Sequence, residues 1–139
     1  MLLVYNVPNK PTSNRLFVWR KLKKLGALLL HDSVWVLPAN PHTREQLRWL
    51  ASEIVELKGE ATVWEARQAL TADEDKLVAR FNETVEDSYR ELLAELKRKN
   101  RDLAAASRRY QQLRSQDYFN SQLGQRVREA LIAAKGDGS

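Results

Sequence analysis

The residue types best able to do chemistry in this chain are the basic side chains of its first 25 residues. That stretch contains six Lys and Arg residues and no acidic residue. Basic side chains bind phosphate groups and release counterions from nucleic acids when they do so. The stretch therefore favours contacts with a sugar-phosphate backbone. Its basic residues are Lys10, Arg15, Arg20, Lys21, Lys23 and Lys24.

Most of these residues fall within one predicted helix, which we expect to begin near Asn14 and to end at Gly26. At 100° per residue, one arc is apolar and is expected to face a sheet. That arc holds Val18, Trp19, Leu22 and Leu25. The opposite arc holds Phe17 with the cations Arg20, Lys21, Lys23 and Lys24. This arc predicts contacts with phosphate groups. The alternative is that the arc is a solvated face, with Phe17 at a contact between subunits.

A second group of basic side chains lies in the C-terminal half. Residues 97–114 include seven basic and one acidic residue, whereas residues 73–96 include three basic and eight acidic ones. The basic group can pair with the acidic stretch or extend a nucleic-acid surface, and both alternatives stay open. The candidates for nucleic-acid contacts in this group are Lys97, Arg98, Arg101, Arg108 and Arg109.

Catalytic and metal-binding patterns find little support in the sequence. There is no cysteine, and the two histidines, His31 and His42, belong to no ligand motif. The five glycines form no phosphate-binding loop, and no nucleophile with a nearby base can be assembled. We therefore expect a protein that is not an enzyme, with no catalytic residue, no bound metal and no cofactor.

The composition is that of a folded protein. The chain has 139 residues, of which 43% are hydrophobic and 29% charged, with a net charge of +5 and a pI near 9.6. No apolar run approaches the roughly 20 residues that span a bilayer. The N-terminal stretch lacks the basic region of a signal peptide. We expect a cytoplasmic protein without a membrane partner.

The first half alternates short strands with helices. Strands are predicted at residues 2–5, 27–30, 34–37 and 62–64, with helices at 14–26 and from Asn40-Pro41 to Gly59. The order βαββαβ predicts a ferredoxin-like antiparallel sheet in a domain of residues 1–70. The first three strands are apolar at every position instead of alternating. The second face of the sheet is therefore expected to be covered, by a partner subunit or by the C-terminal half.

The second half, residues 71–139, is predicted to be an all-helical extension. Apolar residues recur at spacings of three and four from Val78 to Leu113, which is typical of a coiled coil. The pattern leaves open whether this is one long helix or a hairpin that breaks near residues 99–101. A last short helix is expected to end near Ala134.

Three aromatic residues are candidates for an interface. Trp49 lies opposite the apolar stripe of its predicted helix, and an exposed tryptophan commonly marks a contact with a partner. Phe17 lies among the cations of the first helix. The interface candidates are Phe17, Trp35 and Trp49.

Several segments in a fixed order carry a family resemblance. They are WRKLKKLGA at 19–27, VWVLP at 34–38, REQLRWLA at 44–51, GEA at 59–61, EAR at 65–67, ARFN at 79–82 and RSQDYF at 114–119. Together they resemble the N-terminal domain of the ChrB family, regulators associated with chromate resistance. The resemblance implies a transcriptional regulator that binds double-stranded DNA. Family members are expected to carry a further C-terminal domain that senses chromate. This chain ends before such a domain, so chromate is a doubtful direct effector.

The first half is also similar to the ferredoxin-like domain shared by PaaX-type repressors and the CRISPR-associated adaptation nuclease. The similarity rests on Val4-Tyr5-Asn6, Asn14-Arg15-Leu16, residues 22–26 and Ser33-Val34. It implies a homodimer. In the nuclease an aspartate that can bind a divalent metal closes the first strand, and here that position is Asn6. A neutral amide lacks the anionic oxygens that a hard cation prefers.

Three hypotheses follow for the function. The leading one is a dimeric DNA-binding regulator of the chromate-resistance type that lacks the sensor domain. The second is a non-enzymatic interaction module that forms a homodimer or a hetero-complex through Phe17, Trp49 and the charge-segregated helix. The third, a metal-dependent nuclease, is the least favoured because of Asn6.

Overall fold

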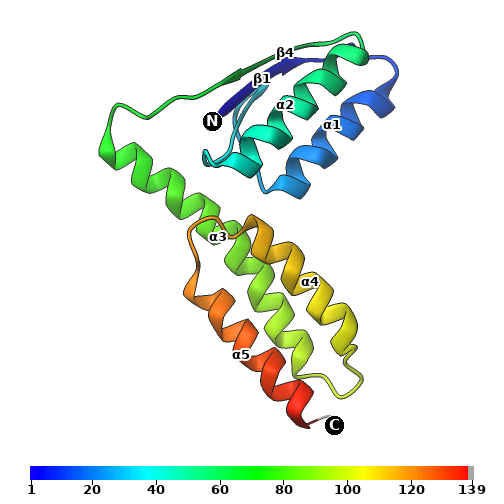
Figure 1. Cartoon of the computed structure of the whole chain (residues 1–139), viewed down its shortest axis with the longest axis vertical. Helices are drawn as coiled ribbons and strands as arrows, with labels where there is room; N and C mark the ends of the chain where they lie inside the picture. Colours follow the sequence, from blue (N-terminus) through cyan, green and yellow to red (C-terminus); the bar gives the residue numbers. More distant parts are fainter. Residues whose placement is uncertain (138–139) are drawn as a thin grey trace. The chain divides into compact units, whose positions relative to one another are not determined.

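The computed structural model describes residues 1–137 and has an α+β architecture (Figure 1). The chain divides into two compact units, the first Met1–Ala69 and the second from Leu70 onward. The predicted fold class, a ferredoxin-like sheet followed by helices, is confirmed. In chain order the elements are β1 (Leu2–Asn6), α1 (Thr12–Leu25), β2 (Leu28–His31), β3 (Val34–Val36), α2 (Pro41–Glu56), β4 (Glu60–Trp64), α3 (Thr71–Leu96), α4 (Leu103–Gln116) and α5 (Gln122–Asp137).

The first unit contains one sheet of four strands in the order β2-β3-β1-β4. Every neighbouring pair is antiparallel, and Leu3 of β1 lies opposite Trp35 of β3 and Val63 of β4. Both α1 and α2 lie on the same face of this sheet (Figure 1). The strand order and the shared helix face are those of the βαββαβ fold.

The core of the first unit lies between the sheet and these two helices. Leu3 and Ile54 are fully buried, and Gly59 passes so close to the carbonyl oxygen of Asn6 that an added Cβ would lie 2.5 Å from it. Trp35 is only 3% exposed because its place beside Leu3 directs the ring toward the helices. Its side chain is therefore unavailable for the interface role predicted for it. The helices contribute the buried residues Val18, Leu22, Leu47, Leu50 and Ile54.

The ends of α1 and α2 follow local capping rules. Gly26 ends α1 with a φ of 78°, in the left-handed region, and its N–H donates to the carbonyl of Lys23. Asn40 begins α2, where its Oδ1 accepts from the N–H of Thr43 at 2.8 Å. At the other end of α1 the prediction was wrong by two residues, since the helix begins at Thr12 without a side-chain cap. The two ends of α1 set the length of the helix that carries the basic side chains.

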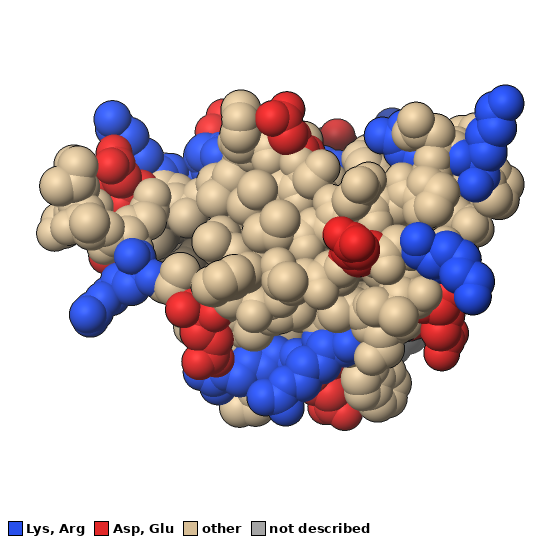
Figure 2. Space-filling model, turned by 90° about the horizontal axis from the view of Figure 1, so that it is seen from above, with Lys and Arg blue, Asp and Glu red and all other residues tan. Residues whose placement is uncertain are grey.

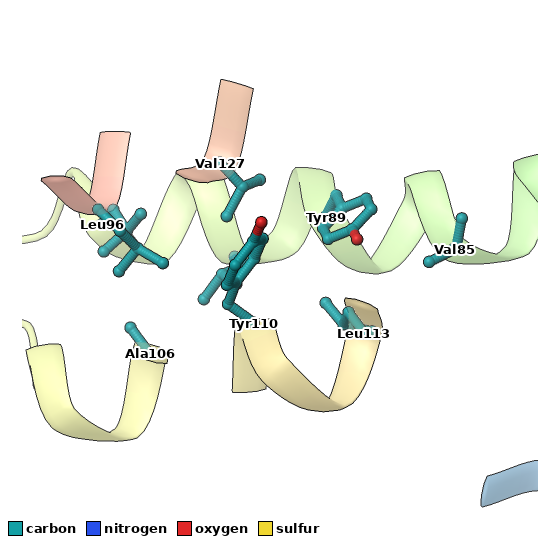
Figure 3. Close-up of a cluster of buried hydrophobic side chains, with 9 residues drawn as sticks. Val85, Tyr89, Leu96, Ala106, Tyr110, Leu113 and Val127 are labelled. Atoms are coloured by element: carbon teal, nitrogen blue, oxygen red, sulfur yellow. The ribbon is translucent and has the colours of Figure 1, made fainter. Parts of the chain in front are cut away.

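The second unit is a bundle of α3, α4 and α5. Residues 97–102 separate α3 from α4, which resolves the open question in favour of the hairpin. Asp102 caps α4 by accepting from the N–H of Ala105 at 3.0 Å. The apolar stripe predicted from the sequence packs between the helices (Figure 3). The buried cluster is Val85, Tyr89, Leu92, Leu96, Ala106, Tyr110, Leu113, Val127 and Leu131.

A buried carboxylate ties the bundle together where α4 ends. One oxygen of Asp117 accepts from the Tyr89 hydroxyl at 3.0 Å, and the other accepts from the N–H of Ser121 at 2.9 Å. Ser121 in turn donates through its hydroxyl to Glu86 at 3.0 Å. Gly124 fits tightly here, because an added Cβ would lie 2.9 Å from both the Tyr89 ring and Asp117. Burial, reinforced by Asp117, raises the pKa of Tyr89 well above its ordinary value.

Tyr118 and Phe119, which follow this carboxylate, pack against α3. The Phe81 ring lies edge-on to Tyr118 at 6.2 Å and tilted to Phe119 at 6.0 Å between centroids. Such pairs stabilise a fold by about 0.5–1.5 kcal/mol beyond the apolar area they bury. Burial raises the pKa of Tyr118 from 10.0 to about 12.

The pKa of Tyr118 predicts a loss of stability in alkaline solution. Below pH 10 the phenol is protonated in both states, so its contribution is fully present. As the pH rises from 10 toward 12 the unfolded chain ionises first, and the free energy of unfolding falls. Urea unfolding of wild type and Tyr118→Phe at about pH 8 and about pH 11 should show a steeper loss for wild type. Equal losses in the two proteins would contradict this assignment.

Candidate nucleic-acid interface

The outward side of α1 is the most basic surface of the first unit. Only Val18 and Leu22 of this helix are buried, and the helix contains no acidic residue. Its five basic side chains, Arg15, Arg20, Lys21, Lys23 and Lys24, are all exposed. No carboxylate lies within the helix itself, so the charged side chains that the helix presents to an anionic ligand are all positive.

Three of these cations surround a shallow groove. The groove has a volume of about 410 Å³ and is lined by Ser13, Phe17, Arg20, Lys21 and Lys24. The spacings of three, four and seven place these residues on one stripe of the helix. Phe17 is 38% exposed, and the Lys21 ammonium lies 5.6 Å from the centre of its ring. We call these five residues the α1 groove.

Lys23 lies apart from the α1 groove. Its ammonium is 5.6 Å from the Trp19 ring and 6.0 Å from the Trp35 ring, on another flank of the helix. Trp19 is 49% exposed, so the prediction that it faces the sheet is wrong. It lies about 100° around the helix from the buried Val18, at the edge of the region that the sheet covers. The four cations predicted on one arc are therefore divided between two flanks.

Arg15 lies near the start of α1 and outside the groove. Its Nη1 donates to Oδ1 of Asn9 at 3.0 Å, in the loop that precedes the helix. Ser13 was not predicted as a site residue. Its spacing of four from Phe17 was the available signal, because it places the hydroxyl on the same stripe as the ring.

The basic residues of the C-terminal half belong to the second unit. Lys97 and Arg98 lie in the turn after α3, and Arg108 and Arg109 lie on α4, all exposed. Arg101 donates through Nη1 to the carbonyl of Leu96 at 3.4 Å. Within residues 1–137, no salt bridge joins the basic residues of 97–114 to the acids of α3. The acids Glu86 and Asp87 pair instead with Arg90 of the same helix.

The two remaining interface candidates are accessible. Phe17 lies in the α1 groove, and Trp49 on α2 is 61% exposed. In the view of Figure 2, basic side chains form a contiguous group at the lower edge.

Asn6 lies at the exposed end of β1, opposite Glu60 of β4. Among the residues that the structure describes, no group of three or more His, Asp or Glu side chains is placed to hold a metal ion. Nor does any helix among these residues have the length and apolar character needed to cross a membrane.

Segments that are distant in the sequence but share the family resemblance contact one another in the structure. Arg44 of α2 forms a salt bridge with Glu65, just after β4, and this contact lowers the pKa of the Glu65 carboxyl. Phe81 of α3 packs on Tyr118 and Phe119. Several residues that carry the resemblance thus have structural roles in one unit or the other.

Comparisons with known proteins agree with the resemblance. The family described as "Protein ChrB, N-terminal" matches residues 15–111. The chain is 31% identical over 96 residues to Protein ChrB of Cupriavidus metallidurans, and this alignment covers 69% of the chain but only 29% of that protein. No solved structure gives a significant match. The chain therefore belongs to the ChrB family and corresponds to its N-terminal part.

Proposed function

We propose that this protein is a DNA-binding transcriptional regulator of the chromate-resistance type, and that the α1 groove holds the phosphate backbone of its operator. The observation that carries the proposal is the groove itself. Arg20, Lys21 and Lys24 surround it, and no acidic side chain lies anywhere in the helix. Membership of the ChrB family supports a regulatory role.

The chemistry of the groove suits a phosphodiester. The guanidinium of Arg20 can donate two hydrogen bonds to one phosphate, whereas Lys21 and Lys24 act as point charges. The Ser13 hydroxyl adds a neutral donor, and the exposed Phe17 ring offers an apolar contact for a sugar. Contacts of this type position a protein on duplex DNA, while base-edge contacts provide the sequence information.

A titration against DNA tests the proposal. The full chain is titrated by fluorescence anisotropy against a duplex from its own upstream region and against a shuffled duplex, each at low and at moderate salt. We expect tighter binding to the native duplex, with a salt slope of about −0.9 for each phosphate neutralised. If both duplexes bind equally and moderate salt abolishes the binding, the protein has a basic surface but no preference for its own upstream sequence. Absence of binding would contradict the proposal.

A second candidate function, a protein-interaction module, rests on Trp49. At 61% it is the most exposed of the four tryptophans, and it lies on α2 outside the α1 groove. Trp49→Ala distinguishes the two candidates, because it should leave DNA affinity unchanged while weakening capture of a protein partner.

A further inference from the structure

Helix α4 presents an outward stripe of polar and small side chains. Its residues Ala106, Tyr110 and Leu113 belong to the buried cluster of the second unit (Figure 3). At about 100° per residue, the opposite side of the helix is formed by positions 104, 108, 111 and 115. All four positions are exposed, and we call them the α4 stripe. The α4 stripe consists of Ala104, Arg108, Gln111 and Ser115.

The charged residues of α4 are all arginines. The helix contains no acidic residue and no lysine, whereas α1 has three lysines among its five cations. The other two helices of the second unit differ in charge, since α3 contains eight acidic residues and α5 exposes Glu129. An anionic partner of the second unit is therefore expected to bind to α4.

The long side chains on the exposed part of α4 are not engaged elsewhere in the protein. None of the salt bridges within residues 1–137 includes Arg108, Arg109 or Arg114. The side chain of Gln111 makes no hydrogen bond within the same residues. These donors and acceptors are therefore available to a partner without the loss of an internal contact.

We propose that the α4 stripe reads base pairs in the major groove of the operator, with Arg108 and Gln111 as the specificity-determining residues. This inference rests on the proposed function, in which the α1 groove holds phosphates and leaves the base readout unassigned. A guanidinium can donate two hydrogen bonds to O6 and N7 of guanine. The amide of a glutamine can make a paired contact with N6 and N7 of adenine. Arginine and glutamine are therefore residue types suited to base edges as well as to phosphates.

The dimensions of α4 suit the major groove. The helix has 14 residues and is about 21 Å long, and a helix with its side chains is about 10–12 Å across. The major groove is about 12 Å wide. Ala104 and Ser115 are small and lie at the two ends of the stripe, so the backbone can approach the base edges closely. Arg109 and Arg114 lie on opposite flanks of the helix, where the sugar-phosphate strands border the groove.

Titration of the full chain against the native upstream duplex and the shuffled duplex tests the proposal. The variant combines Arg108→Ala with Gln111→Ala. The control combines Gln125→Ala with Arg128→Ala, the same two changes at exposed positions of α5 with the same spacing of three. Alanine favours a helix at all four positions, so the fold is expected to be retained.

The quantity to compare is the preference for the native duplex, expressed as the ratio of the two dissociation constants. The variant should lose about thirtyfold of this preference, which corresponds to two paired base contacts at the low end of their range. The control should keep the preference of wild type. An equal loss of affinity for both duplexes in the variant would mean that the stripe contacts phosphates only, and would overturn the inference.

The remaining outcomes separate this inference from the proposed function. If wild type prefers the native duplex and the variant keeps that preference, α4 does not read bases, while the proposed function stands. If wild type binds neither duplex, or binds both equally, the proposed function fails and this inference fails with it.

Replacing the base pairs of the native duplex one at a time gives a second readout. Gln111→Ala should lose the response of wild type to one A·T pair, and Arg108→Ala should lose the response to one G·C pair. The two residues are about 4.5 Å apart along the helix axis. The rise of one base pair is about 3.4 Å, so the two affected pairs should lie within about two positions of each other. If both single variants respond to every replacement as wild type does, the inference is wrong.

Discussion

Reversing the three cations of the α1 groove is expected to lower the affinity for the operator duplex by about a thousandfold. The variant combines Arg20→Glu, Lys21→Glu and Lys24→Glu. A hydrogen bond to a charged group contributes about 1.5 kcal/mol at the low end of its range, and three such losses amount to a thousandfold in the dissociation constant. The salt slope should also become shallower by about three, because three phosphate contacts are removed.

The matched control reverses three exposed cations elsewhere. Arg126→Glu, Arg128→Glu and Lys135→Glu on α5 change the net charge by the same amount. Both variants are titrated against the same duplex after their helical content has been compared by circular dichroism. If the α5 variant loses as much affinity as the groove variant, binding follows net charge and the assignment of the site is wrong. A single Lys23→Glu change should cost less than any one groove reversal, since Lys23 lies on a different flank.

Asp117→Ala is expected to lower the free energy of unfolding of the second unit by about 3 kcal/mol. The change leaves the buried Tyr89 hydroxyl and the N–H of Ser121 without their acceptor. Each unsatisfied buried donor costs about 1–3 kcal/mol. Such a loss is a large share of the 5–15 kcal/mol that holds a typical domain together.

Urea unfolding followed by circular dichroism measures this loss. Asp87→Ala is the control, because it also removes a carboxylate that accepts a hydrogen bond, but that carboxylate is exposed and pairs with Arg90 on the same helix. We expect the control to change stability by less than about 0.5 kcal/mol. Similar losses in the two variants would mean that the Asp117 hydrogen bonds add little.

The order of elements could be predicted from the sequence because local signals mark their ends. Gly26 and Asn40 are residue types that commonly stop and start helices, and both have those roles here. The break between α3 and α4 was harder, because residues 97–102 contain neither proline nor glycine. The remaining signal was Asp102, a good capping residue whose role depends on the helices packing as a hairpin.

The site was only partly predictable, for a geometric reason. A helical wheel gives the angle of each side chain but not the width of the surface that its neighbours cover. Because the covered surface is narrower than the wheel suggests, Trp19 is exposed. For the same reason Lys23 lies near the Trp19 and Trp35 rings and outside the groove. The role of Asp117 could not be predicted either, because Tyr89 is 28 residues away in the sequence.

The position of Lys23 gives the first unit an optical property. Its ammonium lies within 6.0 Å of the centres of both the Trp19 and Trp35 rings. A charge this close to an indole shifts the energy of its excited state, so the colour of the emitted light depends on the local electric field. An anion that neutralises Lys23 changes that field. The fluorescence of Trp19 and Trp35 should therefore report, without an added label, the binding of an anion near Lys23.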